Sequence, residues 1–202
     1  LTFPTVSSYN ADEAPLDILA DIIGGGKNSI LYKNFIKTEQ AVSADAMHPT
    51  SELAGDFEIS VRAMPDKKLS DMEAMIRTAL AEFEKRGVTD DDLLRFKASH
   101  EASLINSIAT VNGKAASLAS YQTFTGNPNQ IGNELARYSK VTKEDVMRVY
   151  NKYIKGKPAV VLSVYPKGKP EQVAKPNNFT PPTSGKAMNV TDYSGLEIGR
   201  AH

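Results

Sequence analysis

The 202-residue sequence contains no cysteine and no tryptophan, and it has only three histidines. Without cysteine the chain can form no disulfide scaffold, has no thiol nucleophile and offers no thiolate to a metal. Acidic and basic side chains balance at 24 each, which excludes the basic footprint of a nucleic-acid-binding protein. No run of about 18 apolar residues occurs, so the sequence predicts no membrane-spanning helix.

The histidines are too few and too scattered to predict a metal site. His48, His100 and His202 lie far apart, and none has a second histidine at helical spacing. The H-x-x-E-H pattern that holds zinc on a helix is absent, and no serine stands in a G-x-S-x-G turn. We therefore expect no metal ligands and no catalytic residues in this chain, and we interpret His100 as a packed structural side chain.

The apolar residues predict an α+β fold. Hydrophobic residues make up 41% of the chain and charged residues 24%, which is ordinary for one globular domain. The stretch 56–64 alternates, with Phe57, Ile59 and Val61 on one face, as in an antiparallel sheet with one wet face. The whole pattern predicts a two-layer domain in which helices cover an antiparallel or mixed sheet. Its expected elements are a strand at 1–7, helices at 11–23 and 28–38, strands at 41–47 and 56–64, five helices between 69 and 156, and a strand at 159–165.

The two ends of the sequence suggest a piece of a longer polypeptide. The opening stretch 1–7 is β-prone and starts abruptly, so we expect a first strand that lacks its beginning. The stretch 159–165 is apolar enough for a central strand. After it the composition becomes rich in proline and poor in large apolar side chains. We therefore predict one domain over 1–165 and a linker or tail over 166–202 that leads to a further domain.

Three polar patterns each allow a structural and a functional interpretation. The run Gly24-Gly25-Gly26-Lys27 could bind phosphate, but its spacing does not fit a P-loop. A helix cap with a tight turn is favoured, and a glycine-lined surface that another backbone approaches is the third interpretation. The acidic run 90–92 after Thr89 is favoured as a helix start over a cation site. Lys97 and Glu101 are spaced for an ion pair on one helix.

The glycine run lies in a longer stretch with a recognisable signature. Residues 22–35 read I-I-G-G-G-K-N-S-I-L-Y-K-N-F. This resembles the G-G-G-x-x-S-x-L signature of the insulinase-like (pitrilysin-type) zinc metallopeptidases, in the non-catalytic half of each pair. Further stretches are similar to later parts of that domain and occur in the same order, so that the resemblance covers roughly residues 1–165. They are 9–14, 55–61, 86–93, 141–146 and 159–164.

The resemblance implies a role in proteolysis without catalysis by this chain. Family members pair a half that carries H-x-x-E-H with a half that lacks it, and the two close around an unfolded peptide. The peptide adds as a strand to a sheet edge of the active half, where zinc activates water. The resemblance thus implies that this chain holds no cofactor and that zinc belongs to a catalytic domain of the same polypeptide or of a partner subunit. Exported bacterial relatives suggest a periplasmic setting by analogy.

The resemblance also implies candidate substrate contacts. In heteromeric relatives the glycine-rich loop of the non-catalytic subunit handles substrate, and Gly24, Gly25, Gly26 and Ser29 match the core of that loop. Many such halves also place an arginine and a tyrosine near the zinc. The corresponding stretch 35–43 has neither, and Lys37 is the candidate for the positive charge.

Two other functional hypotheses remain open on the sequence. The chain could be a scaffold or interaction module whose partner is not catalytic, which a full-length polypeptide without any zinc motif would favour. It could also be an independent enzyme of another class, although no residue constellation predicts one.

Overall fold

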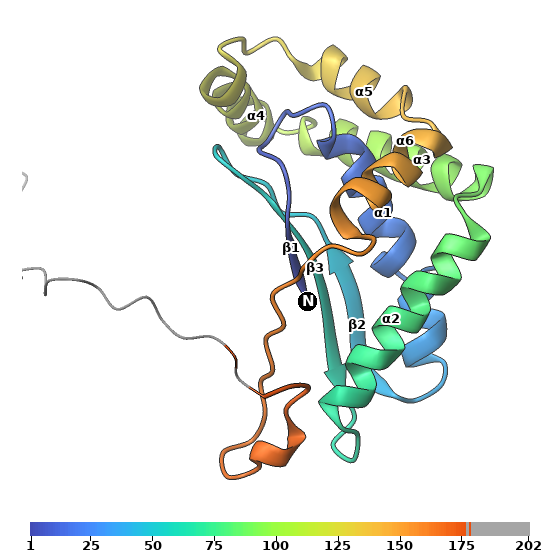
Figure 1. Ribbon diagram of the computed structural model, residues 1–202. Coiled ribbons are helices and arrows are strands. Elements are labelled where there is room, and N and C mark those ends of the chain that lie inside the picture. The colour runs from blue at the N-terminus through green and yellow to red at the C-terminus, as the bar shows by residue number, and fades with distance from the viewer. Residues whose placement is uncertain (177, 179–202) are drawn as a thin grey trace, which may run out of the picture.

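The computed structural model describes residues 1–176 and 178 (Figure 1). Its sheet has three antiparallel strands in the order β1-β3-β2, so that β3 lies in the middle. The strands are β1 (Thr2–Pro4), β2 (Ala41–Met47) and β3 (Asp56–Ala63). The helices are α1 (Glu13–Gly24), η1 (Tyr32–Ile36), α2 (Leu69–Arg86), α3 (Asp90–Ser107), α4 (Val111–Thr125), α5 (Ile131–Ser139), α6 (Lys143–Val149), η2 (Tyr150–Ile154) and η3 (Pro170–Gln172).

The sheet has one covered and one uncovered face, as the alternation in β3 predicts. Phe57 and Ile59 are buried, whereas Ser60 and Arg62, which follow them in β3, are exposed. The helices lie on the covered side (Figure 1), and α1 and α2 both contact the sheet. The predicted two-layer α+β fold is therefore confirmed.

Helix α1 forms the centre of the core. Ten of its twelve residues are buried, which is more than the single apolar stripe of a surface helix. It packs on β2 on one side and contacts α3, α5 and α6 on others. The largest fully buried side chains include Leu16, Leu19 and Ile23 from α1 and Phe83 and Tyr150 from α2 and η2.

Two of the predicted helices contain π-helical turns. The segment predicted as a helix over 28–38 contains the π-helix η1. The last predicted helix consists of α6 followed by the π-helix η2. Both π-helices bury aromatic side chains, Phe35 in η1 and Tyr150 in η2. The wider turn changes which residues share a face, and hydrophobic periodicity does not report it.

The predicted closing strand is wrong. Residues 159–165 are extended but pair at only one isolated bridge, between Thr2 and Val160. The side chains of Val160, Leu162 and Val164 are 68%, 80% and 82% exposed, so the segment is not central. Its neighbour in the described residues is β1, a strand of three residues that pairs with it only at Thr2.

The second half of α3 and helix α4 project from the core. Among residues 101–130, which we call the arm, Tyr121 is the only one that is buried. It contacts Tyr9 with a ring-centroid distance of 6.4 Å. No helix in the described residues is long and apolar enough to cross a membrane. Most of the predicted tail, together with His202, lies outside the described residues.

Candidate functional site

The glycine turn between α1 and η1 is shaped by close packing. A methyl group at Gly24 would lie 1.9 Å from the backbone nitrogen of Ala46 in β2. Helix α1 therefore approaches the strand at a distance that only a hydrogen atom fits. Gly26 has φ +77°, in the left-handed region that favours glycine. Gly25 is half-buried against Asp21, and burial raises the pKa of the Asp21 carboxyl.

Ser29 closes the same turn. Its hydroxyl donates a 2.7 Å hydrogen bond to the carbonyl oxygen of Gly26 and accepts one of 3.2 Å from the backbone nitrogen of Tyr32. The side chain is buried, so its role in the free chain is to cap the helical segment that follows. Lys37 follows η1 at the other end of that segment, and it is exposed.

The structure thus brings Ser29 and Gly26 together. Gly24 allows the close packing of α1 on β2, and Gly26 and Ser29 shape the turn. Gly26 and Lys37 are exposed, whereas Gly24 and Ser29 are buried. Contact of these residues with a substrate stays a prediction.

A set of three carboxylates at the start of α1 was missed by sequence reasoning. Asp12 accepts hydrogen bonds from Arg148 at 2.6 Å, Lys152 at 2.8 Å and Tyr153 at 2.7 Å. Burial alone would raise the pKa of Asp12, but these three donors outweigh it and lower the pKa to about 2. The carboxylate therefore ties α6 and η2 to the start of α1.

Glu13 makes the second connection. Its carboxylate accepts hydrogen bonds from the Arg137 guanidinium at 2.6 Å, the Thr50 hydroxyl at 2.8 Å and the backbone nitrogen of Tyr9 at 2.6 Å. The Arg137 guanidinium also lies 5.2 Å from the centre of the Tyr9 ring. Glu13 thus joins α5, the loop between β2 and β3, and the segment before α1.

Asp17 makes the third connection, through a histidine. The Nδ1 atom of His48 lies 2.7 Å from Asp17, and its Nε2 atom lies 3.0 Å from the Thr5 hydroxyl. Tyr138 donates a 2.5 Å hydrogen bond to the same carboxylate. The order Thr–His–Asp is that of a catalytic triad, but the His48 side chain has no exposed surface. A substrate cannot reach it, so we interpret the chain of bonds as structural.

Only the topology brings these groups together. The basic partners of Asp12 and Glu13 follow them by 124 to 140 residues in the chain. In the sequence, acidic residues here suggest no more than a favourable charge at a helix start. The usable signal is that Asp12, Glu13 and Asp17 stand on a helix whose other residues are almost all apolar.

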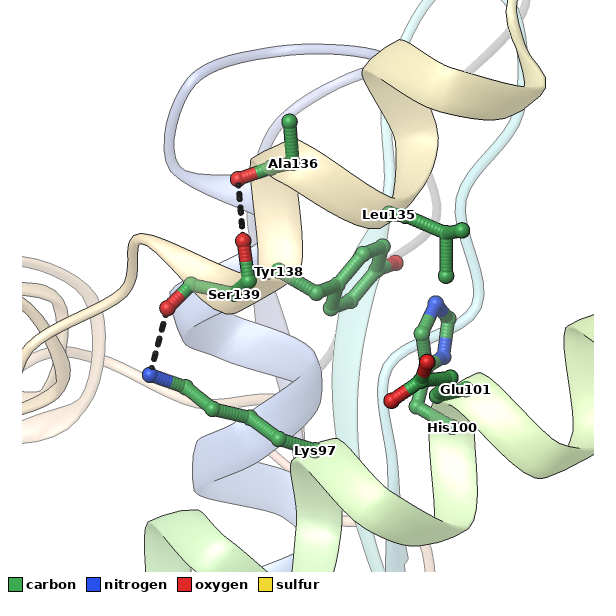
Figure 2. Close-up of a pocket in the computed structure, with 7 residues that line it drawn as sticks. All are labelled: Lys97, His100, Glu101, Leu135, Ala136, Tyr138 and Ser139. Atoms are coloured by element: carbon green, nitrogen blue, oxygen red, sulfur yellow. Dashed lines mark hydrogen bonds between the residues drawn. The ribbon is translucent and has the colours of Figure 1, made fainter.

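Figure 2 shows the small pocket around His100, between α3 and α5. The His100 ring lies 3.8 Å from the Tyr138 ring, centre to centre, and stacks on Phe96 at 5.7 Å. Burial lowers the pKa of His100, which keeps the ring neutral at neutral pH. The pocket measures about 160 Å³, which is below the usual range for a ligand site. His100 is thus the packed side chain that the sequence predicts.

The predicted ion pair between Lys97 and Glu101 is wrong. The Lys97 ammonium instead donates a 2.7 Å hydrogen bond to the carbonyl oxygen of Ser139 (Figure 2). It donates a second, also of 2.7 Å, to the carbonyl oxygen of Val141. Those carbonyls belong to the last residue of α5 and to the second residue after it. A helix leaves its last carbonyls unsatisfied, and a cation is favourable there. At the start of α3, the acidic run forms the expected helix start: Thr89 and Asp92 make a reciprocal capping box.

The side chains present do not fit a zinc ion. Within residues 1–176 no group of three or more histidine, aspartate and glutamate side chains is placed to hold a metal. His48 has both ring nitrogens within hydrogen-bond distance of protein atoms, and His100 is stacked between aromatic rings. No step of a reaction is therefore assigned to a metal in this chain.

Comparison with known families finds a match for the first part of the chain. The family described as the peptidase M16 inactive domain matches residues 1–99. This match covers just under half of the 202 residues. The match includes the glycine turn and all three strands, and it confirms the resemblance to the insulinase-like peptidases. A search among curated proteins found no match for the chain.

Solved structures support the M16 fold. A protease from Helicobacter pylori has a TM-score of 0.68 and 21% identity, over 76% of this chain and 37% of that protein. The inactive peptidase domain of a zinc protease from Bordetella parapertussis has a TM-score of 0.64 and 14% identity, over 75% and 84%. Complex III2 from Candida albicans contains a chain with a TM-score of 0.62 and 10% identity, over 76% and 40%. The chain thus spans little more than a third of the length of the Helicobacter protease.

Proposed function

We propose that this chain is the non-catalytic half of a zinc-dependent metalloendopeptidase or oligopeptidase. Opposite it would stand a catalytic H-x-x-E-H domain, in the same polypeptide or in a partner subunit, that supplies the zinc. The observation that carries the proposal is the match of residues 1–99 to the M16 inactive domain. The chain would form the wall of a chamber and hold unfolded peptides there while the partner cleaves them.

The uncovered face of the sheet is the surface best suited to such a wall. It carries exposed or half-exposed side chains at alternate positions of β3, including Glu58, Ser60 and Arg62. Asp45 and Met47 of β2 are exposed beside them. The face thus carries acidic and basic side chains, a hydroxyl group and an apolar side chain. It could therefore contact peptides of mixed composition without selecting one residue type.

The glycine turn and Lys37 are the proposed clamp. Gly26 and the two residues after it are exposed at the end of α1, where a peptide backbone can approach closely because Gly26 has no side chain. Lys37 offers an exposed cation to a carbonyl or carboxylate of the peptide. In this proposal the turn limits where the peptide runs, and Lys37 contributes charge.

The test is reconstitution with an H-x-x-E-H domain from the same polypeptide or partner. We expect hydrolysis of an unfolded reporter peptide to need both components and to stop when a chelator is added. The Arg62→Glu and Lys37→Glu variants should raise KM. The same charge change at Lys114→Glu, on exposed α4, should leave KM unchanged. Hydrolysis that is equally fast without this chain would contradict the proposal.

The scaffold hypothesis makes a different prediction for the same experiment. A scaffold would bind a partner that lacks H-x-x-E-H, and no combination with that partner would cleave the reporter. Stable association without chelator-sensitive hydrolysis, together with a partner sequence that has no zinc motif, would favour the scaffold over the peptidase half.

A further inference from the structure

The corner between α3 and α4 holds the pair Asn112-Gly113, the only Asn-Gly pair in the sequence. An asparagine side chain before glycine is prone to attack by the next backbone nitrogen, because glycine has no Cβ to hinder the approach. Asn112 is exposed, and Val111 before it is 87% exposed. Water therefore has access to the reacting groups at this corner.

Close packing requires the glycine of this pair. A methyl group at Gly113 would lie 1.8 Å from the carbonyl oxygen of Ser107, the last residue of α3. The turn from α3 into α4 thus leaves no room for a side chain at residue 113. A larger residue there would shift the corner, so the pair cannot be made less reactive at its second position.

The Thr110 hydroxyl holds the attacking nitrogen in the folded chain. The Gly113 N–H is one of the first of α4, which have no carbonyl of their own helix to bond. It donates a 3.0 Å hydrogen bond to Thr110 Oγ1, and Thr110 is itself exposed. A cyclic imide between the two residues does not fit helical backbone angles, so the first turn of α4 must open before the ring can close.

We propose that Asn112 is a site of spontaneous deamidation that becomes reactive when the Thr110 cap opens. The Gly113 nitrogen then forms a bond to Cγ of Asn112, and the side-chain amide nitrogen leaves as ammonia with the proton that Gly113 gives up. Water adds to one of the two carbonyl carbons of the resulting cyclic imide, which leaves aspartate or isoaspartate at position 112. The inference does not depend on the proposed peptidase function.

Two other asparagines show what protects such a side chain. Asn127 precedes Pro128, whose nitrogen carries no hydrogen and cannot close the ring. The Asn34 amide donates a 2.8 Å hydrogen bond to Glu82, and the residue after it, Phe35, is fully buried. At Asn112 a glycine follows and the side chain is exposed, so the cap is the remaining protection.

The two products would affect the arm in different ways. Aspartate places a carboxylate in the first turn of α4, where it is favourable to the helix dipole. Isoaspartate adds a methylene group to the backbone before Gly113 and displaces this residue from Ser107. The corner that joins α4 to α3 would then lose its close packing. Either product gives the formally neutral chain a net negative charge.

The test follows deamidation in the full chain at physiological temperature. Trypsin releases the peptide 98–114, which contains both Asn106 and Asn112, and mass spectrometry of its fragments reports the two separately. We expect the acid to accumulate at residue 112 well before residue 106, which is also exposed but precedes serine. The chain unfolded in urea should react faster still, because no cap remains.

Two variants of Thr110 test the role of the cap. Thr110→Ala removes the hydroxyl and should speed both amide exchange at Gly113 and deamidation of Asn112 about fivefold. Thr110→Ser keeps a hydroxyl at the same position and should leave both rates near those of the native chain. The two rates should change by the same factor, because both reactions require the same opening.

Four outcomes would overturn the proposal. Acid that forms no faster at residue 112 than at residue 106 would show that Asn112 is not a preferred site. Faster exchange in Thr110→Ala without faster deamidation, or equal rates in the folded chain and in urea, would show that the cap does not control the reaction. Asn112→Gln should abolish the early acidic species in isoelectric focusing, and its persistence would place the reaction elsewhere in the chain.

Discussion

The body of the molecule, residues 1–100 and 131–154, and the arm, residues 101–130, are both mainly helical but are held in opposite ways. Every fully buried member of the hydrophobic core belongs to the body. The arm buries one side chain, Tyr121, and exposes Val111 at 87% and Leu118 at 51%. The M16 family match ends at residue 99, where the arm begins. The packed residues 131–154 lie outside that match, so the match covers only the first part of the body.

The largest expected difference is between core truncations in the two regions. Phe57→Ala removes a fully buried ring of β3 and should lower the free energy of unfolding by about 3–5 kcal/mol. Leu118→Ala in the arm should change it by less than about 0.5 kcal/mol. Chemical denaturation monitored by circular dichroism measures both. Similar losses for the two would mean that the arm is part of the core.

The glycines sharpen the comparison. In Gly24→Ala the new methyl group meets the backbone of β2, and the strain should cost about 1–3 kcal/mol of stability. Gly132→Ala is its control, because it lies in α5 with no atom within 4 Å of the new methyl group. That variant should gain about 0.5–1 kcal/mol from helix propensity. Thermal unfolding of the two proteins should shift in opposite directions, and a neutral Gly24→Ala would refute the close approach.

Acid should weaken the body through Asp12. Its pKa is lowered to about 2 in the fold from about 3.9 in an unfolded chain. A lowered carboxyl pKa contributes stability that is present above pH 4 and lost as the pH falls toward 2, and here it amounts to about 2 kcal/mol. The difference in stability between the native chain and Asp12→Asn should therefore shrink between pH 5 and pH 2, as measured by urea denaturation. A constant difference would contradict the ion network.

The smallest expected effects come from two helix caps of the same residue type. The Thr89 and Thr110 hydroxyls each accept a hydrogen bond from the third residue of their helix, at 3.1 and 3.0 Å. Thr89→Ala should cost about 1 kcal/mol in global unfolding, since α3 begins in the body. Thr110→Ala should leave global stability nearly unchanged and speed amide exchange in α4 by local opening. Equal losses of global stability in the two variants would mean that the arm unfolds together with the body, which would contradict this comparison.

The sequence predicts those features that depend on local pattern. The alternation of Phe57 and Ile59, the Thr89 cap and the helix over 69–86 all follow from periodicity and capping, and the structure has them. Prediction fails where distant parts of the chain decide the outcome. The apolar stretch 159–165 needs a partner strand that β1 is too short to provide. The bonds from Arg148 to Asp12 and from Tyr138 to Asp17 each join residues more than a hundred positions apart.

The candidate site was predicted in part for the same reason. The glycine signature identifies the family, but the close contact between Gly24 and Ala46 depends on where β2 lies against α1. The exposure of Gly26 and Lys37 depends on how η1 turns. Residue types alone predict neither the contact of Gly24 nor the exposure of Gly26 and Lys37.

The most direct test of the central claim is the zinc content of the purified chain, with hydrolysis of an unfolded peptide assayed in the same sample with and without a chelator. We expect no stoichiometric zinc and no chelator-sensitive cleavage until a catalytic H-x-x-E-H domain is added. One tightly bound zinc per chain, with cleavage that the chelator abolishes, would contradict the assignment of this chain as a non-catalytic half.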